Sequence, residues 1–323
     1  MRIATFNLEN LDDGGTPNLE DRIWIMKPQL ERVNADILCL QEVHSQGTTD
    51  NRTLVALDQL MDETKYANFK RETTKTTDGK LYVERNIVTM IRPDFDFSDV
   101  EIIRDTSGPR PSYQMATAIP EDTTSQPVSW ERPMLYTQIN LGSGRILHVI
   151  NLHLKSKIAS NIPGQKIDNF TWRTVSAWAE GNFISSMKRV GQALQTRLLI
   201  DKIFDDHGLG SLIAACGDFN ADLHEVPMKA IRGQVEETGN PDHGPRLMIP
   251  CESNIPEPSR YSLWHLGQGQ MLDHIIASRP LIQFFSHAEI HNEALPDESG
   301  AFRTDIKFPE SDHAPVVAEF SLG

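Results

Sequence analysis

Short apolar runs that end in acidic, amide or imidazole residues recur along this chain of 323 residues, and they constrain its fold more than any other feature. The runs with their polar ends are Ile3–Glu9, Leu40–Val43, Asn151–His153, Gly217–Asn220, Leu272–His274 and Ser311–Pro315. Short apolar runs bounded by polar residues are typical of buried strands. If these runs are strands of one scaffold, their polar ends gather at one end of it. We therefore expect side chains from both ends of the polypeptide to converge.

The spacing of the apolar residues predicts an alternation of strands and helices. Strands are expected at residues 2–7, 37–40, 87–91, 134–139, 146–152, 211–216, 274–277 and 315–321, with a hairpin turn at 142–144. One helix is expected from Leu19 to Val33, and a second follows a stripe of apolar residues from Met187 to about Phe204. Residues 158–181 are expected to form a long loop leading into the second helix, and residues 236–260 an irregular surface excursion.

This alternation favours an α/β fold in which two mixed β-sheets pack face to face and are flanked by helices. The opening strand, helix and strand are expected to place Asn7 and Glu42 at the same sheet edge, because such units usually give neighbouring parallel strands. With candidate site residues spread from Asn7 to His313, one domain over residues 1–323 is the simplest organisation. Two halves built as related sheets are also compatible with the pattern.

The charge balance argues mildly against a protein that coats nucleic acid by bulk attraction. The chain has 31 basic and 45 acidic residues, a net charge of −14. Two stretches are locally basic: Lys65–Arg85 has six basic and three acidic residues, and His153–Arg173 has four and one. Both adjoin candidate site motifs, although solvated loops would have the same composition.

Nothing in the sequence predicts a membrane span or a disulfide framework. No run of 18 apolar residues occurs. A strand-like segment follows Met1 directly and leaves no room for a signal peptide, so a cytoplasmic location is expected; a secreted chain whose leader had been removed would look the same. The three cysteines, Cys39, Cys216 and Cys251, have no metal-ligand spacing and are expected to be reduced. No obligate protein partner is indicated.

The polar ends of the runs contain the groups that a metal ion and a phosphate ester require. They are the carboxylates Glu9, Glu42, Asp218, Asp273 and Asp312, the amides Asn7, Gln41, Asn151 and Asn220, and the imidazoles His153, His274 and His313. A set rich in carboxylates and free of sulfur favours Mg²⁺, with Mn²⁺ as a substitute. Any one motif alone is more often a turn or a helix cap, and His274 is expected to be a packing residue. The case rests on the whole set.

The order of these motifs resembles that of the endonuclease/exonuclease/phosphatase superfamily, the metal-dependent phosphodiesterases related to deoxyribonuclease I, and in particular its bacterial nuclease-like branch. The matching segments are Phe6–Glu9, Leu40–Val43, Asn151–His153, Gly217–Asp222, Leu272–Ile275 and Ser311–Pro315, which span nearly the whole chain. The resemblance implies a four-layered α/β sandwich with the site at one end of the two sheets. It also implies that Glu42 is the main metal ligand, with Asn7, Glu9 and Asp312 around the ion.

The resemblance further implies catalytic roles for five residues. His313 would touch the scissile phosphate as base or electrostatic stabiliser, with Asp273 or Asp312 fixing its tautomer and charge. Asp218 would orient or deprotonate the attacking water, and Asn220 would donate a hydrogen bond to the phosphate. His153 would contact the phosphate and protonate the leaving oxygen. The roles of Asp218 and His313 stay exchangeable at this point.

The same resemblance favours a nuclease acting on DNA, with RNA as a further substrate, by in-line attack of water. Four residues are expected to bind the substrate, and they are Asn151, Lys155, Lys157 and Arg85. A phosphatase or phosphodiesterase for lipid headgroups or small metabolites is the alternative, although the Asp-Arg pair of the inositol-phosphatase branch is replaced by Asp273-His274. A binding module of the same fold without catalysis is the second alternative.

Overall fold

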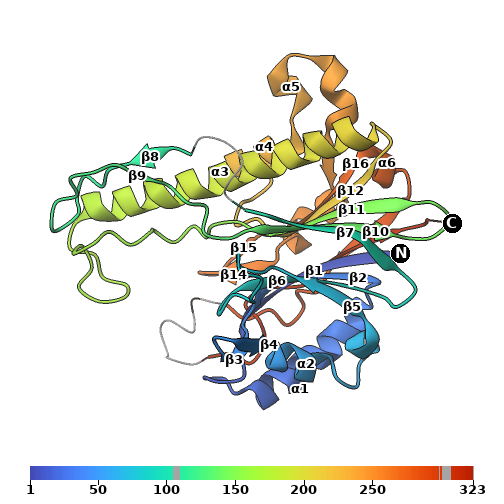
Figure 1. The fold of residues 1–323 in the computed structure, drawn as a ribbon, viewed down its shortest axis with the longest axis horizontal. Coiled ribbons are helices and arrows are strands. Elements are labelled where there is room, and N and C mark those ends of the chain that lie inside the picture. Colours follow the sequence, from blue (N-terminus) through green and yellow to red (C-terminus); the bar gives the residue numbers. More distant parts are fainter. Residues whose placement is uncertain (105–109, 298, 300–306, 323) are drawn as a thin grey trace.

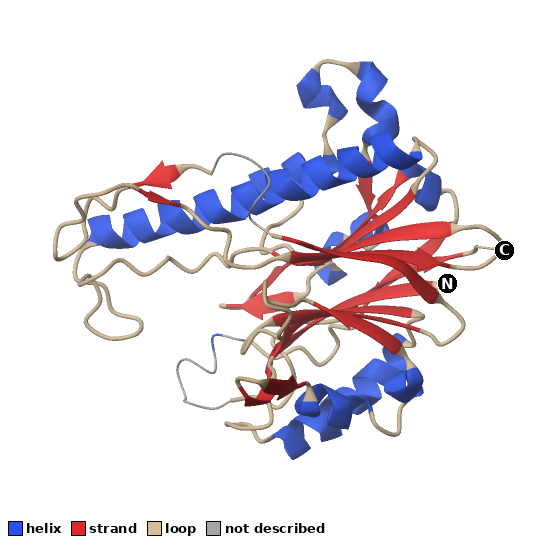
Figure 2. Ribbon diagram, viewed as in Figure 1, coloured by secondary structure: helices blue, strands red, loops and turns tan. Residues whose placement is uncertain are grey.

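Two six-stranded β-sheets lie face to face in a computed structural model that describes residues 1–104, 110–297, 299 and 307–322 (Figures 1 and 2). The strands of the first sheet are, in order, β17 (Phe285–Ile290), β18 (Val316–Phe320), β1 (Arg2–Leu11), β2 (Ile37–Val43), β6 (Asn86–Ile91) and β5 (Lys70–Thr73). Those of the second are β13 (Met248–Pro250), β16 (Asp273–Ser278), β12 (Leu212–Asp218), β11 (Ile146–His153), β10 (Met134–Asn140) and β7 (Asp96–Ile103).

The two sheets repeat one pairing pattern. In each, the two central strands are parallel, β1 with β2 and β11 with β12. The other neighbours in both sheets pair antiparallel. A parallel pair needs a crossover connection, and helices α1 (Leu19–Val33) and α3 (Val175–His207) lie in these two crossovers. The sheets are therefore related halves, one of the arrangements with which the sequence is compatible.

Helices cover the outer face of each sheet and complete four layers (Figure 1). Beside the first sheet lie α1 and α2 (Val55–Met61), and beside the second lie α3 and α4 (Val226–Arg232). Apolar clusters fill the three gaps between layers, represented by Met26 and Leu57, by Ile3, Val149 and Ile275, and by Ile200 and Met228. Strands buried on both faces read as nearly continuous apolar runs. The predicted α/β fold with two packed mixed sheets flanked by helices is confirmed.

Strand alternation determines where the polar ends of the runs point. Successive side chains on a strand face opposite sides, and Ile3, Val149 and Ile275 belong to the cluster between the sheets. Asn7, His153 and Asp273 lie an even number of residues from these three positions on β1, β11 and β16, so they lie on the same inner faces. The packing that buries the central core thus aims these polar groups into the gap between the sheets.

The remaining strands and α-helices are short. They are the strands β3 (Gln46–Thr48), β4 (Asn51–Thr53), β8 (Ser112–Tyr113), β9 (Gln126–Pro127), β14 (Leu263–His265) and β15 (Gln268–Gln270) and the helices α5 (Val235–Thr238) and α6 (Arg279–Ile282). Within the described residues, no helix has both the length and the apolar character needed to cross a bilayer. The three cysteines are buried and free, as expected.

The second long helix differs from the sequence-based expectation. It begins at Val175, where Thr174 caps the first turn by accepting a hydrogen bond from the Ala177 amide at 3.1 Å, so the end of the expected loop is helical. Val190, Leu194 and Leu198, from the stripe that predicted the helix, lie on its outer side and are 36%, 55% and 54% exposed. Small and polar residues share the buried side and dilute its apolar signal; they include Gly181, Ser185, Gln192 and Thr196.

The expected surface excursion at residues 236–260 is only partly a surface segment. Its strand β13 pairs with β16 at the edge of the second sheet. The short 3₁₀ helix η3 (Cys251–Asn254) follows and places Glu252 in the interior, fully buried. The expectation was wrong for these residues because proline and polar composition does not show which side chains turn inward.

Candidate active site

A cleft of about 510 Å³ lies at the end of the gap between the two sheets. Ten of the residues expected at the site line it: Asn7, Glu9, Glu42, Arg85, His153, Lys157, Asp218, Asn220, Asp312 and His313. They come from strand ends and loops of both sheets, separated by up to 306 positions in the chain. The convergence predicted from the sequence is therefore present.

Asp218, at the end of β12, is the centre of the hydrogen-bond network in the cleft. Its Oδ1 accepts a hydrogen bond from the backbone N–H of Asn220 at 2.8 Å. Its Oδ2 accepts from the side-chain Nδ2 of Asn220 at 2.9 Å and of Asn7 at 3.1 Å. His153 Nε2 lies 3.1 Å from the same Oδ2. Burial alone would raise the pKa of Asp218, but the imidazoles of His153 and His313 and the Asn220 amide hold it well below its ordinary value. The carboxylate is ionised, and among the described contacts Oδ2 has three donors whereas Oδ1 has one.

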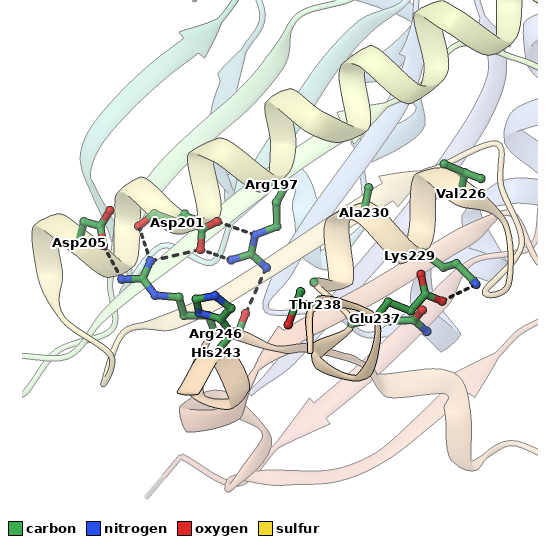
Figure 3. Close-up of a pocket in the computed structure, with 12 residues that line it drawn as sticks. Arg197, Asp201, Asp205, Val226, Lys229, Ala230, Glu237, Thr238, His243 and Arg246 are labelled. Carbon is green, nitrogen blue, oxygen red and sulfur yellow. Dashed lines mark hydrogen bonds and ion pairs between the residues drawn. The ribbon is translucent and has the colours of Figure 1, made fainter. Parts of the chain in front are cut away.

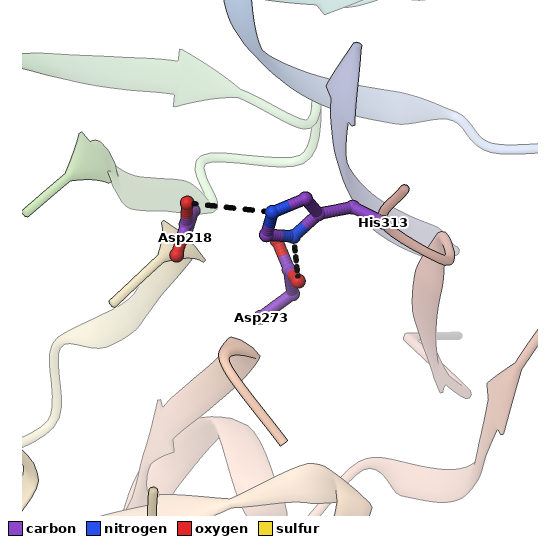
Figure 4. Close-up of side chains that lie close together, drawn as sticks. All are labelled: Asp218, Asp273 and His313. Carbon is purple, nitrogen blue, oxygen red and sulfur yellow. Dashed lines mark hydrogen bonds and ion pairs between the residues drawn. The ribbon is translucent and has the colours of Figure 1, made fainter. Parts of the chain in front are cut away.

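His313 is held by a short hydrogen bond to Asp273. Its Nδ1 lies 2.6 Å from Asp273 Oδ2, and its Nε2 points toward Asp218 Oδ2 at 3.9 Å (Figure 4). Burial alone would lower the pKa of His313, but the surrounding aspartates, Asp273 first among them, raise it well above its ordinary value. His313 is therefore an imidazolium with its Nε2–H directed toward the centre of the site.

His153 differs from His313 in charge. It is 3% exposed, and burial together with the nearby Arg132 guanidinium lowers its pKa. Because ionised Asp218 accepts from Nε2, the proton of the neutral ring sits on Nε2. Its Nδ1 is buried and has no hydrogen-bond partner among the described residues. Of these two imidazoles in the cleft, that of His313 is cationic and that of His153 is neutral.

Oxygen donors from four residues, Asn7, Glu9, Glu42 and Asp312, line the cleft on the side of the first sheet. Asn7 Oδ1 accepts from the Glu9 amide at 3.0 Å, and Glu9 Oε2 accepts from the Asp312 amide at 3.0 Å. Glu42 Oε1 lies 3.7 Å from His153 Nε2. Burial raises the pKa of Glu9, a cost that a bound cation would offset. An oxygen-only set with a buried carboxylate fits a hard divalent ion.

Two aspartates and a histidine form another group of candidate metal ligands, and their contacts are better explained without a metal. Asp218, Asp273 and His313 offer donor atoms within 4.8 Å of one another. Because His313 Nδ1 and Asp273 Oδ2 are hydrogen-bonded to each other, those two atoms are already occupied. Two donor atoms of the trio are thus engaged with each other, and among the described residues Glu9, Glu42 and Asp312 form no second group of this closeness.

Backbone conformations at the strand ends build the cleft. Glu9, Asn10, Glu42 and Asn220 have positive φ values of 45°, 51°, 58° and 47°, which non-glycine residues adopt infrequently. The pairing of β1 with β2 shifts register between Asn7 and Leu11, so Glu9 and Asn10 form a bulge. Glu42 Oε2 accepts from the Asn10 amide at 3.0 Å and ties the bulge to β2. Half of the ten non-glycine residues with positive φ values in the described part of the chain line the cleft.

Basic residues surround the acidic centre. Arg85 is 45% exposed and its Nε lies 3.9 Å from Glu42 Oε1. Lys157 lines the cleft and pairs with Glu225 at 2.9 Å. Arg132 also lines the cleft, although the sequence analysis did not select it; its Nη1 donates to the Leu154 carbonyl at 3.2 Å.

The sequence contained a signal that could have found Arg132. The turn at residues 142–144 fixes the register of the β10–β11 hairpin, in which Leu135 pairs with Asn151. That register places Pro133 opposite His153 and leaves Arg132 one residue further along. A basic residue beside a candidate catalytic histidine could therefore have been inferred from the turn alone.

Two residues expected to bind substrate lie outside the cleft. Asn151 is fully buried between the sheets, where its Nδ2 donates to the Val88 carbonyl at 2.9 Å and its Oδ1 accepts from Gln41 Nε2 at 2.7 Å. Its hydrogen-bonding groups are occupied, so the assignment to substrate binding is corrected. The Lys155 ammonium lies 3.9 Å from Glu131 with a side chain only 14% exposed, and it does not line the cleft.

A larger cavity, of about 920 Å³, lies beside α3 and α4 on the outer side of the second sheet (Figure 3). Its charged groups pair with one another: Arg197 with Asp201, Lys229 with Glu237, and Arg246 with both Asp201 and Asp205. This cavity contains none of the residues expected at the site. Its paired charges leave little electrostatic demand for a ligand.

Comparison with known proteins agrees with this geometry. A model of the Endonuclease/Exonuclease/phosphatase family matches residues 4–313. The chain belongs to this family. It is therefore an enzyme of the metal-dependent phosphodiester hydrolase type. No curated protein sequence matches the chain at a significant level.

Solved structures of the family share the fold over nearly the whole chain. A truncated TDP2 from Caenorhabditis elegans superposes with a TM-score of 0.58 and 16% identity, covering 99% of this chain and 97% of that one. An AP endonuclease from Archaeoglobus fulgidus gives 0.54 and 16%, with full coverage of both chains. An endonuclease/exonuclease/phosphatase family protein from Bacteroides thetaiotaomicron gives 0.58 and 15%, covering 98% and 93%. At these identities the likeness shows the fold.

Proposed function

We propose that this protein is a Mg²⁺-dependent nuclease that hydrolyses phosphodiester bonds in DNA, with RNA as a further substrate, by in-line attack of water. The observation that carries the proposal is the meeting of two sets of side chains in one cleft. The oxygen donors of Asn7, Glu9, Glu42 and Asp312 line the cleft next to the Asp218, His153 and His313 network, and Asn7 and Glu42 contact that network directly. A phosphate bound between them would meet a cation site and hydrogen-bond donors at once.

The protonation states suggest a division of labour between Asp218 and His313. His313 carries a proton on Nε2 and would donate it as a hydrogen bond to a non-bridging phosphate oxygen, where charge builds up in the transition state. A protonated imidazole cannot act as the base. Asp218 would orient the attacking water through its carboxylate, and its strongly lowered pKa makes it a weak proton acceptor.

The other two polar residues of this network would act differently. Both hydrogens on Nδ2 of the Asn220 side chain already make hydrogen bonds, one to Asp218 Oδ2 and one to the Leu154 carbonyl at 3.2 Å. Asn220 would therefore hold Asp218 in place rather than contact the phosphate. The neutral His153 ring donates its Nε2–H to Asp218 Oδ2 in this structure, and with substrate bound it would redirect this hydrogen to the leaving oxygen.

Asn7, Glu9, Glu42 and Asp312 would hold the ion in this proposal. When bound, Mg²⁺ would neutralise charge on the phosphate and make the phosphorus more open to attack. Mn²⁺ should substitute, since it accepts the same oxygen donors. Sulfur ligands are absent from the described cleft residues, which argues against a zinc enzyme.

The lining of the cleft favours a substrate with more than one phosphate group. Arg85, Arg132 and Lys157 surround the acidic centre at positions where they could bind flanking phosphates. Leu263 and Leu272 form an apolar stretch of the same lining that suits a sugar or base. The net charge of −14 predicts that the grip on a polynucleotide is local and sensitive to salt.

The size of the cleft also fits a second candidate function. A volume of about 510 Å³ accommodates a phosphodiester with small substituents, such as a lipid headgroup or a metabolite. In this case Arg85 and Lys157 would select the charge of the headgroup rather than the phosphates of a strand. The chemistry of the centre is the same for both substrates.

The test is hydrolysis of four substrates by the purified protein with Mg²⁺, with Mn²⁺ and with EDTA. The substrates are plasmid DNA, single-stranded RNA, bis-p-nitrophenyl phosphate and inositol phosphates. Cleavage of DNA that stops in EDTA supports the nuclease. Cleavage of the small esters with intact DNA and RNA supports the second candidate, and no turnover of any substrate overturns both.

A further inference from the structure

His274 and Glu252 form a polar pair that the proposed reaction does not use. Both side chains are fully buried. His274 Nδ1 lies 2.5 Å from Glu252 Oε1, and its Nε2 lies 2.9 Å from the Ala221 carbonyl oxygen. A carbonyl oxygen only accepts, so Nε2 carries a hydrogen and donates it. His274 was expected to be a packing residue, but both of its ring nitrogens hold polar groups.

The two neighbours of Asn220 both contact His274. The Phe219 ring meets the imidazole edge to face, with centroids 5.3 Å apart, and the Ala221 carbonyl accepts from Nε2. Asn220 itself has a left-handed φ of 47° and donates two hydrogen bonds to Asp218. The turn that fixes the catalytic carboxylate is thus anchored on either side of its strained residue by one imidazole.

The anchor comes from the opposite side of the sheet. Side chains alternate along β16, so Asp273 faces the gap between the sheets and bonds to His313, whereas His274 faces the outer layer. Glu252, on η3, reaches His274 from that layer and fixes the direction of the ring. Neither Glu252 nor His274 lines the cleft.

We propose that Glu252 and His274 are positioning residues for phosphodiester hydrolysis. Through the Ala221 carbonyl, His274 sets where Asn220 and Asp218 stand, and Glu252 keeps the imidazole aimed at that carbonyl. This inference rests on the hydrolytic function proposed above. It predicts a change in kcat with no change in metal affinity, because the oxygen set around Glu42 is untouched.

Two substitutions at the same position separate the tether from simple burial. In His274→Asn the amide can replace Nδ1 beside Glu252 but cannot reach the Ala221 carbonyl, and in His274→Gln the amide can replace Nε2 and keep that bond. We expect His274→Asn to lower kcat about tenfold to hundredfold, the scale of a misplaced catalytic group, with KM and Mn²⁺ affinity nearly unchanged. His274→Gln should restore most of the rate.

His148→Asn is the matched control. His148 on β11 is a buried imidazole of the same sheet, 2.8 Å from the Tyr136 hydroxyl and distant from the cleft. Equal losses of kcat in His274→Asn and His148→Asn, or no rescue by Gln, overturn the inference.

Crystal structures of the variants decide the matter even if the wild type hydrolyses nothing. In that event the proposed function fails on its own assay. A displaced Phe219–Ala221 turn in His274→Asn, with a native turn in His274→Gln, supports the positioning role. A native turn in both variants overturns it.

Discussion

Each sheet has an Asp-His dipeptide at a strand next to its parallel pair, but the side chains of the two dipeptides point in different directions. Beside β1 lies β18, which Asp312-His313 precedes, and beside β12 lies β16, which opens with Asp273-His274. His313 sits in a turn held by Ser311, whose Oγ donates to the Asn7 carbonyl at 2.7 Å and accepts from the His313 amide at 3.1 Å.

The second dipeptide is inside its strand and obeys strand alternation. Asp273 pairs with Asp218 in the ladder and faces the gap between the sheets, so His274 must face the outer layer. One dipeptide therefore supplies an imidazole to the site and the other supplies the carboxylate that holds it. The comparison shows that similar halves produce an asymmetric site when a strand starts a few residues earlier.

The largest effect should come from the histidine in the turn. We expect His313→Ala to lower kcat at least about a hundredfold, because it removes the imidazolium that would bind the phosphate. The measurement is kcat at saturating metal, with circular dichroism to verify the fold. His287→Ala, at an exposed histidine of β17 in the same sheet, is the control. Equal activity of the two variants would break the assigned asymmetry.

The next effect concerns the metal side of the first half. Glu42→Gln should raise the concentration of Mg²⁺ or Mn²⁺ needed for half-maximal activity by about tenfold to a hundredfold, since a carboxylate ligand is lost. Calorimetric titration with Mn²⁺ measures the same loss without turnover. The control is Glu101→Gln, at an exposed position on β7 of the second sheet. An unchanged metal requirement in Glu42→Gln would move the ion elsewhere in the cleft.

A third prediction tests the polar link between the halves. Asn151→Leu should lower the free energy of unfolding by about 1–3 kcal/mol, because Gln41 Nε2 and the Val88 carbonyl lose buried partners. KM should stay the same in the folded variant, since Asn151 does not line the cleft. Denaturant unfolding and steady-state kinetics measure the two quantities. A raised KM with unchanged stability would restore the original assignment to substrate binding.

The smallest effect concerns how the free energy of unfolding depends on acid pH, and it comes from His148 on β11 of the second sheet. Burial and the neighbouring His207 lower the pKa of His148 from 6.5 to about 4. Between these pH values the unfolded chain binds a proton that the folded one does not, so stability should decrease as pH falls from 6.5 to 4. His148→Asn, whose amide oxygen can replace Nδ1 as the partner of Tyr136, should flatten this part of the stability profile. An identical profile in the variant would show that other groups cause the acid sensitivity.

Much of the fold and of the site followed from the sequence because both depend on strand ends. Runs buried on both faces gave the central strands, and the polar residues after them gave ten of the residues that line the cleft. Edge strands such as β7 and β17 were not predicted, because they are short on apolar residues and half exposed. That residues 1–323 form a single domain stays a prediction.

The errors within the site have a physical cause. Asn151 and His153 lie on the same face of β11, two residues apart, and only the distance from the strand end separates an interior amide from a cleft imidazole. Sequence periodicity reports the face of a strand but not the depth at which the cleft begins. Glu252 was missed because a single acid in a polar, proline-rich stretch carries no sign of burial.

A set of buried polar side chains beneath the cleft forms hydrogen bonds within and between the two sheets. Thr5 donates to Gln41 at 3.3 Å, Gln41 bonds to Asn151 across the gap, and Asn151 returns to Thr89 at 3.2 Å. Apolar faces alone would allow the sheets to slide, whereas these bonds are directional. They oppose sliding of one sheet against the other directly beneath the cleft, where side chains from both sheets must keep their relative positions.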